Sequence, residues 1–440
     1  MSLQEGSARG FRAYTTKHLD DLLRRAGLDA EERIRVRAVA AVLPFRTNAY
    51  VVDRLIDWSA VPDDPIYRLV FPQSDMLPEP DVSRLAGLLR DDAPPAEIQA
   101  VAHGIRERLN PHPAGQLDLN VPHVGMDPVP GMQHKYPETV LFFPRQGQTC
   151  HAYCTYCFRW AQFVGEPELK FASDDVANLV GYLKNHPQVT GVLLTGGDPM
   201  IMGESVLRRY VEPLLELEQL ESVRIGTKSL AYWPQRFVSD PDAGDTLRLF
   251  ASVVEAGKHL ALMAHFSHPR EMEPSIVREA VTRIGDTGAV IRTQAPLIRS
   301  INDRPETWSS MWRGQVAMGM VPYYMFVERD TGPQDYFAVP LVRAYEIFRD
   351  AYSRVSGLCR TVRGPSMSAT PGKVCVDGVA EIAGQRVFVL HFIQARDPRL
   401  VGRPFFARYD PAAVWLTDLR PAFADRFPFE PVTAAWSLYV

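Results

Sequence analysis

The sequence predicts an α/β protein built around an open partial barrel of six parallel strands. Six short runs are rich in β-branched and aromatic residues: VLFFP (140–144), GVLLTG (191–196), SVRIGT (222–227), LALMAHF (260–266), AVIRTQAPL (289–297) and VPYYMFVE (321–328). After the first run they recur about every thirty residues, which is typical of βαβ units around a parallel sheet. Six units are too few for a closed eight-stranded barrel, so we expect an open barrel with its chemistry at the carboxyl ends of the strands.

The segments between these runs predict the covering helices. Residues 174–186, 243–257 and 273–288 carry apolar side chains at helical spacing, as expected for helices that pack one face on a sheet. A doubly wound sheet is the structural alternative. It is disfavoured because no G-x-G-x-x-G follows the first predicted strand.

The two ends of the chain differ from this middle region. Residues 16–27 and 81–91 have helical patterns separated by Pro-rich joints, whereas residues 372–382 and 385–393 form short strand-like runs near Gly and Pro. We therefore expect a helical N-terminal layer (1–125), the partial barrel (126–335) and a small α+β C-terminal region (336–440) with a strand-rich tail.

Composition excludes several classes of protein. The chain has 440 residues, 46% of them hydrophobic, and a formal net charge of −4 without a basic stripe, so nucleic acid is not expected as the main partner. Residues 1–14 contain no apolar core segment, and no stretch reaches the 18 or so apolar residues of a membrane span. Five cysteines, three of them clustered, do not form a disulfide framework. We expect reduced thiols and a cytoplasmic protein.

The clustered cysteines, Cys150, Cys154 and Cys157, follow the first predicted strand directly. A zinc site would take a fourth ligand from His151, Cys359 or Cys375, and chance clustering of unligated thiols is a third reading. A [4Fe–4S] cluster held by three cysteines leaves one iron open for catalysis. This last reading explains why no fourth cysteine accompanies the three.

At this point the sequence resembles a known family. C-x3-C-x2-C on the first loop of a partial barrel is similar to the signature of radical S-adenosylmethionine (SAM) enzymes, and the wider match, over residues 120 to 410, is to lysine 2,3-aminomutase and its relatives. The motifs that carry it are HKYPETVLFF, LLTGGDPM (193–200), RIGTKSLAYWPQRF (224–237), AHFSHP (264–269), YYMFVERD (323–330) and PGKV (371–374). The resemblance implies a partial barrel of radical SAM type, a cluster whose open iron binds SAM, and an isomerase using a 5′-deoxyadenosyl radical.

The GGDP motif after the second predicted strand matches the part of the family that binds SAM. Gly196 and Gly197 would let the backbone approach the cofactor amine closely, and Asp198 would offer a charged acceptor. Without its position one βα unit after the cysteines, GGDP would indicate only a turn.

Lys373 aligns with the family lysine that holds pyridoxal 5′-phosphate (PLP) through an imine. An amino group migrating between carbons needs such a link, and a desolvated lysine is its usual partner. The alternative is a solvated lysine in a Pro-Gly turn. Of the basic residues expected near the phosphate, Lys135 is kept and the other is replaced by Thr139.

Substrate recognition departs from the lysine pattern. Arg159 matches a family arginine that binds the substrate carboxylate, and a guanidinium suits a planar carboxylate. The two family aspartates that hold the distal ammonium group are not both present: Arg329 or Asp330 occupies the first place, and Met367 or Ser368 the second. We therefore expect lysine to be a poor substrate and a neutral or acidic amino acid to be preferred.

Several residues are weaker candidates on position alone. They are His265 and His268 at the end of the fourth strand, and Gln294 and Arg299 around the end of the fifth. Cys359 and Cys375 are expected to be buried apolar residues.

The predicted function is a radical SAM aminomutase that shifts an α-amino group to the β-carbon, with an amino acid as its small-molecule substrate. It would need a reductant such as flavodoxin or ferredoxin, and a homo-oligomer is compatible with the sequence. Two alternatives stay open. One is a radical SAM enzyme that abstracts hydrogen without PLP, and the other is a zinc-stabilised binding protein.

Overall fold

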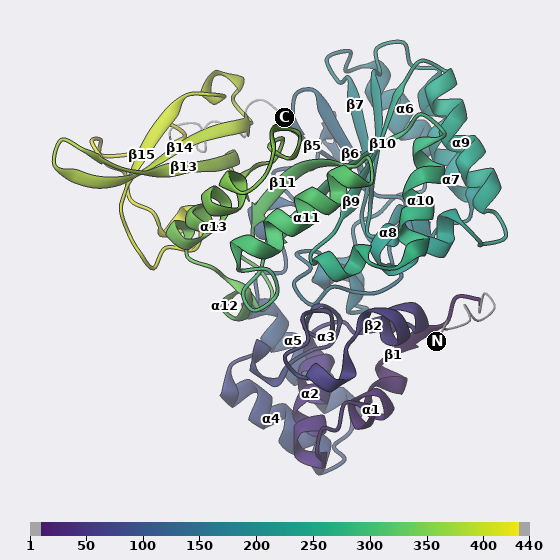
Figure 1. The fold of residues 1–440 in the computed structure, drawn as a ribbon, viewed down its shortest axis with the longest axis vertical. Helices are drawn as coiled ribbons and strands as arrows, with labels where there is room; N and C mark the ends of the chain where they lie inside the picture. Colours follow the sequence, from purple (N-terminus) through teal and green to yellow (C-terminus); the bar gives the residue numbers. More distant parts are fainter. Residues whose placement is uncertain (1–9, 431–440) are drawn as a thin grey trace.

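The computed structural model describes residues 10–430, so the ends of the predicted terminal regions, including most of the N-terminal segment considered above, lie outside it. Figure 1 shows three parts: a helical layer (purple), a barrel-like sheet wrapped by helices (teal to green) and a group of projecting strands (yellow). The helices are α1 Thr16–Arg25, α2 Ala30–Val42, α3 Pro65–Val70, α4 Glu79–Arg90, α5 Pro95–Arg108, α6 Val176–Lys184, α7 Glu204–Leu215, α8 Ser229–Tyr232, α9 Ala243–Glu255, α10 Ser275–Gly285, α11 Pro305–Ala317, α12 Gln334–Phe337 and α13 Leu341–Ser353. The strands are β1 Ala13–Thr15, β2 Arg46–Asn48, β3 His123–Val124, β4 Asp127–Pro128, β5 Met132–Tyr136, β6 Thr139–Phe142, β7 Gly191–Leu194, β8 Ser222–Thr227, β9 His259–His265, β10 Val290–Leu297, β11 Val321–Val327, β12 Arg363–Ala369, β13 Gly372–Ile382, β14 Gln385–Ala395 and β15 Pro404–Arg408.

One eleven-stranded sheet runs through the molecule in the order β5 to β15. The six predicted strands are β6 to β11, all parallel, which confirms the partial α/β barrel. A seventh strand, β12, adds parallel to β11, and β13 to β15 continue antiparallel. The sequence analysis did not predict β5 or β12, because MQHKY and RGPSMSA lack the apolar run of a typical strand.

The barrel interior is lined by alternate residues of each strand. On β8, Val223 and Ile225 are fully buried, whereas Arg224 and Gly226 line hollows in the structure. This is the two-residue period of a strand with one face on the helices and the other toward the barrel. The interior is therefore hollow enough to hold ligands.

The N-terminal layer shares one hydrophobic core with the barrel. Leu23 of α1, Val39 of α2 and Leu85 of α4 belong to the same cluster as Val192 and Ile225 of the barrel strands. The start of α2 is fixed by a capping box in which Asp29 accepts from Glu32 N (2.9 Å) and Glu32 accepts from Asp29 N (3.0 Å). The layer is thus a fixed platform under the barrel.

The C-terminal strands have their own core, which includes Val374, Phe388, Phe392 and Trp415. The predicted boundary at residue 335 lies between β11 and β12, where the sheet continues without a break; the division into three regions stays a prediction. Within the part of the chain that the structure describes, no helix is both long and apolar enough to cross a membrane.

Candidate functional site

The three clustered cysteines line one cavity at the carboxyl ends of the barrel strands. Cys150, Cys154 and Cys157 lie on the loop after β6, and the cavity they border has a volume of about 270 Å³. The loop is tightly turned, since Cys157 N donates to Cys154 O (3.1 Å) and Trp160 N to Cys157 O (3.0 Å). The placement agrees with the expectation that chemistry gathers at this end of a parallel barrel.

The N-terminal layer holds this loop through its backbone. Tyr153 N donates to Arg46 O (2.8 Å), and Thr155 N to Leu69 O (2.9 Å). The fully buried Asn48 donates its side-chain amide to His151 O (3.1 Å) and to Tyr232 O (3.0 Å). The sequence analysis missed this support because the partners are backbone groups far apart in the chain.

The environment of the cysteines favours a cationic ligand. Burial raises the pKa of all three thiols, to about 12 for Cys157, and for Cys150 and Cys157 the charge of neighbouring cysteines raises it further. Three thiolates here need a compensating positive charge. Among residues 10–430, the three sulfur atoms are not all within 4.8 Å of one another.

Of the three candidate fourth ligands for a zinc site, His151 alone borders the cavity. Its Nδ1 is hydrogen-bonded to Ser229 Oγ (2.9 Å), and its ring stacks on Trp233. Cys359 lies in a turn after α13, and Cys375 lies on β13. Both are buried, as expected, outside the cavity lining.

The glycines of GGDP are required by the cysteine loop itself. Gly196 has φ +134°, and a Cβ there would collide with the side chain of Gln148. A Cβ on Gly197 would lie 2.7 Å from Gly147 O and closer still to the carbonyl oxygen of Thr149. Both glycines also line the cavity. The sequence predicted that a cofactor approaches their backbone closely. In the structure, the segment just before Cys150 makes this close approach.

Asp198 is buried and its carboxylate is shared among several donors. It accepts from Thr227 Oγ1 (2.7 Å), Lys228 N (2.8 Å) and Ser229 Oγ (3.0 Å). It also accepts from Met200 N (2.9 Å). These bonds join the end of β7 to the end of β8. Asp198 therefore has a structural role in linking these two strand ends, in addition to its predicted role as acceptor for a cofactor amine.

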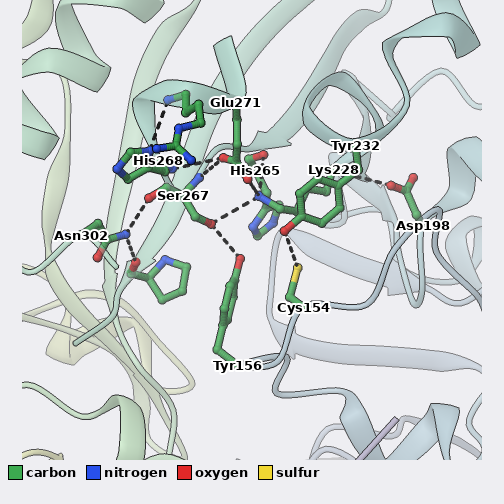
Figure 2. A network of polar contacts seen from close by, with 12 residues as sticks. Cys154, Tyr156, Asp198, Lys228, Tyr232, His265, Ser267, His268, Glu271 and Asn302 are labelled. Atoms are coloured by element: carbon green, nitrogen blue, oxygen red, sulfur yellow. Dashed lines mark hydrogen bonds and ion pairs between the residues drawn. The ribbon is translucent and has the colours of Figure 1, made fainter. Parts of the chain in front are cut away.

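A buried ion pair that the sequence analysis did not identify lies next to Cys154 (Figure 2). Lys228 Nζ contacts Glu271 Oε1 (2.7 Å), with side chains 11% and 0% exposed. The same ammonium lies over the ring of Tyr232 (4.5 Å), whose hydroxyl is 3.8 Å from Cys154 Sγ. The only sequence signal was a lysine directly after the GT that ends β8. The pair places a fixed cation beside the cysteine loop.

Lys373 lies on β13, opposite Ser368 of β12. Its Nζ donates to Gln394 Oε1 (3.1 Å) and sits 4.2 Å above the ring of Tyr324. Burial, followed by the charges of Arg363 and Arg224, lowers the pKa of Lys373 to about 7. About half of the amine is therefore unprotonated at pH 7, and a lysine acts as a nucleophile in that form.

Basic side chains gather around Lys373. Burial lowers the pKa of Lys135 strongly, and the charges of Arg396, Arg329 and Lys373 lower it further. Arg224 Nη2 donates to Thr139 Oγ1 (3.2 Å), so a guanidinium stands where the resemblance expected a basic residue. Such a collection of basic side chains suits a dianionic phosphate. These residues fit PLP.

The predicted substrate residues separate into two groups. Arg159 and Arg329 line the cavity and flank the ring of Phe158, at 4.8 and 4.7 Å. Each has a buried guanidinium nitrogen without a hydrogen-bond partner among the described residues, Nη1 in Arg159 and Nε in Arg329. Burial lowers the pKa of Arg159 to about 9. Asp330 lies outside the cavity lining, where its backbone oxygen accepts from Asn110 Nδ2 (2.6 Å).

Glu328 is a cavity residue that the sequence analysis did not single out. It is 5% exposed and lines the cavity beside Arg329. Burial raises its pKa to about 8, although Arg329 opposes the shift. Its carboxyl group is therefore largely protonated at neutral pH. At the second place of the family pattern, Ser368 lines the cavity and Met367 is buried elsewhere.

The weaker candidates also divide. His265 and Gln294 line the cavity, and the Gln294 amide donates to the His265 ring (2.8 Å between Nε2 atoms). Burial lowers the pKa of His265 to about 3, so the ring is neutral. His268 Nδ1 accepts from Arg270 N (3.3 Å). Arg299 donates to Ala338 O (2.9 Å) and Asp335 O (2.6 Å) away from the cavity.

Similarity to known proteins is found at the level of individual sequences. No family model matches the chain. It is 31% identical over 409 residues to a putative L-lysine 2,3-aminomutase of Aquifex aeolicus, covering 93% of this chain and 96% of that protein. It is 29% identical to L-lysine 2,3-aminomutase of Clostridium subterminale over 53% of each chain, about half of that relative's length. Among solved structures, a radical SAM methyltransferase from Sphaerobacter thermophilus aligns with a TM-score of 0.37 and 17% identity, over 53% of this chain and 68% of that one.

Proposed function

The chain belongs to the lysine 2,3-aminomutase family, and from this premise we propose that it is a radical SAM aminomutase that moves the α-amino group of an amino acid to the β-carbon. One observation carries the proposal. The cavity bordered by Cys150, Cys154 and Cys157 also contains two arginines, each with a buried guanidinium nitrogen that lacks a hydrogen-bond partner among the described residues. Lys373 is not part of the cavity lining, and its Nζ lies 5.7 Å from the ring centroid of Phe326, which is. The proposed iron ligands and carboxylate-binding groups thus share one cavity, and the proposed PLP lysine lies behind one of its wall residues.

The cofactors would be held by residues already described. Cys150, Cys154 and Cys157 would bind a [4Fe–4S] cluster, Gly196, Gly197 and Asp198 would border SAM, and Lys373 with Lys135 would hold PLP. When bound, these groups supply a 5′-deoxyadenosyl radical and a conjugated system that carries the migrating nitrogen. A reductant such as flavodoxin or ferredoxin would supply the electron.

The chain's own residues then prepare the reactants. Because the Lys373 amine has a pKa of about 7, about half of it is unprotonated at pH 7 and can act directly as a nucleophile. Tyr324 and Phe326 cover it with aromatic surface, which limits the access of water. Arg159 would orient the substrate by its α-carboxylate, so that the β-carbon faces the cysteine side of the cavity.

Substrate preference would depend on which charged groups of the substrate find a counter-charge in the cavity. Arg159 satisfies one carboxylate, and Arg329 provides a second cation where the lysine pattern requires a carboxylate. Glu328, the carboxyl group on the same wall, is largely neutral at pH 7. An ammonium group would therefore lack a full counter-charge, and buried groups left unpaired are the main source of discrimination. We expect lysine to react slowly and a neutral or acidic amino acid to be preferred.

The test is a substrate screen with the anaerobically reconstituted enzyme. Lysine, glutamate and neutral amino acids are compared for deoxyadenosine and for β-amino acid formation, in wild type, Arg329→Ala and Asp330→Ala. The proposal expects β-amino product from a non-cationic substrate. Fast turnover of lysine that survives Arg329→Ala and is lost in Asp330→Ala would show that Asp330 is the substrate residue.

The same preparation separates the alternatives. Deoxyadenosine without β-amino product from any amino acid, in protein that borohydride does not link to PLP, would favour the hydrogen-abstracting enzyme without PLP. An iron-free protein with one zinc and no deoxyadenosine would favour the zinc-stabilised binding protein. About four irons per chain, with deoxyadenosine formation abolished by a Cys→Ala change at any of the three positions, would support the cluster.

A further inference from the structure

A second group of metal-binding side chains lies on the hairpin of β13 and β14. Cys375 on β13 is the register partner of His391 on β14. The sulfur of Cys375, a carboxylate oxygen of Asp377 and a ring nitrogen of His391 all lie within 4.8 Å of one another. Their side chains lie outside the cavity lining, and the proposed mechanism does not use them.

An irregularity in the hairpin brings the third residue to this pair. The register shifts between Val376 and Gly378, so Asp377 has no partner on β14. Such a bulge re-aims the side chain of the extra residue. Here the carboxylate meets His391, with 2.6 Å between Nδ1 and Oδ2. Cys375 is buried, whereas Asp377 and His391 are 38% and 30% exposed, so one side of the group is open to solvent.

We propose that Cys375, Asp377 and His391 bind one zinc ion, with water as the fourth ligand. A thiolate, an imidazole and a carboxylate are the side chains that bind zinc in proteins, and three of them with a water make a familiar four-coordinate site. On binding, the Cys375 thiol loses its proton to solvent. The proton that His391 Nδ1 donates to Asp377 moves through solvent to Nε2, so that Nδ1 coordinates as part of a neutral ring. The Asp377 carboxylate then exchanges its bond to the ring for one to the ion.

The charges around the group favour a cation. The Asp377 carboxylate places a negative charge beside the Cys375 sulfur and the His391 ring. The comparable group of His103, Glu166 and Glu168 differs. There the guanidinium of Arg106 already binds Glu166, so that carboxylate has its counter-charge.

The location suggests what the ion does. It would join β13 to β14 two residues after Lys373 on the same strand, and Lys373 in turn contacts Gln394 of β14. A metal link across this hairpin would hold the strand that carries the lysine in register. The site is independent of the iron ligands, so it can be tested whether or not the aminomutase assignment is right.

The experiment measures zinc in the full-length, cluster-reconstituted protein. After zinc addition and exhaustive dialysis, metals are counted by mass spectrometry and the zinc environment is read from its X-ray absorption edge. Wild type should retain about one zinc per chain, with one sulfur and otherwise nitrogen or oxygen ligands. Cys375→Ser and His391→Gln should lose at least tenfold in zinc affinity while keeping their iron. Cys359→Ser, another buried cysteine, should keep both metals.

Three results would overturn the proposal. They are wild type that retains no zinc, Cys375→Ser and His391→Gln that retain it as wild type does, and an absorption edge showing three sulfur ligands, which would place the ion at the iron cysteines. If Cys375→Ser does not fold, His391→Gln decides, because it changes a partly exposed side chain.

Discussion

At the scale of single residues, the lowered pKa of Lys373 leads to the first prediction. Its pKa of about 7, against an ordinary value of 10.5, means that the amine is protonated below about pH 7 and neutral above it. In the coenzyme-free protein, the rate of PLP attachment should therefore rise through pH 7 and level off by about pH 8. The rate is followed by borohydride reduction and peptide mapping. Lys373→Ala should lose the linkage, and the exposed Lys184→Ala should keep it.

Arg159 makes a second prediction at this scale. Removing one partner of a buried charge pair costs roughly 2 to 5 kcal/mol, so Arg159→Met should lower kcat/KM by about 30-fold to 3000-fold. Arg159→Lys should recover only part of this, because an ammonium group cannot bind a carboxylate with two parallel bonds. The exposed Arg145→Met serves as the control. Equal kinetics for Arg159→Met and Arg145→Met would remove Arg159 from the substrate site.

At the scale of secondary-structure elements, Gly197 links the end of β7 to the cysteine loop. Gly197→Ala would push against Gly147 O and the backbone of Thr149, at a cost of roughly 3 kcal/mol, the upper end for overpacking. We expect less iron per chain after reconstitution and a lower Tm. Gly181→Ala, inside α6 with open space around its Cβ, should leave the iron unchanged and raise the Tm slightly. Normal iron loading in Gly197→Ala would contradict the packing argument.

The Lys228 and Glu271 pair joins the end of β8 to the turn after β9. Breaking a buried ion pair from one side destabilises by about 3 to 5 kcal/mol, whereas replacing both partners by apolar residues is often tolerated. Lys228→Met should therefore lower the free energy of unfolding by that amount, and Lys228→Met with Glu271→Leu should recover much of it. Denaturant unfolding of the single and double variants measures the coupling. Additive losses would show that the pair does not act as a unit.

Sequence reasoning succeeded where local pattern determines structure. The six barrel strands are runs rich in β-branched and aromatic residues that recur at βαβ spacing, and the cysteines and GGDP each form a short local motif. It missed β12, whose Gly, Pro and Ser residues become a strand only because β11 and β13 lie on either side. Likewise Lys228 and Glu271 meet, and Arg224 reaches Thr139, only after the barrel forms. Pairings of this kind depend on tertiary distances that no local pattern encodes.

At the scale of the whole molecule, the N-terminal layer is expected to control cluster retention. Asn48 joins it to the barrel through His151 O and Tyr232 O. Asn48→Ala leaves both buried carbonyls without this donor, at about 1 to 3 kcal/mol each. The variant should bleach faster than wild type at the cluster's visible absorbance during exposure to air. Asn185→Ala, at the exposed end of α6, should match wild type, and equal bleaching of all three proteins would show that the layer does not support the site.

The order of strands in the sheet also affects how the chain folds during its synthesis. The cysteines proposed to bind iron follow β6, whereas Lys373 lies on β13, toward the other end of the same sheet. A ribosome delivers the cysteine loop long before that lysine, and domains fold largely in the order of synthesis. A nascent chain can therefore complete its iron ligands while the wall made by β12 and β13 is still missing. Loading the cluster only after release would keep a half-built barrel from generating radicals in open water.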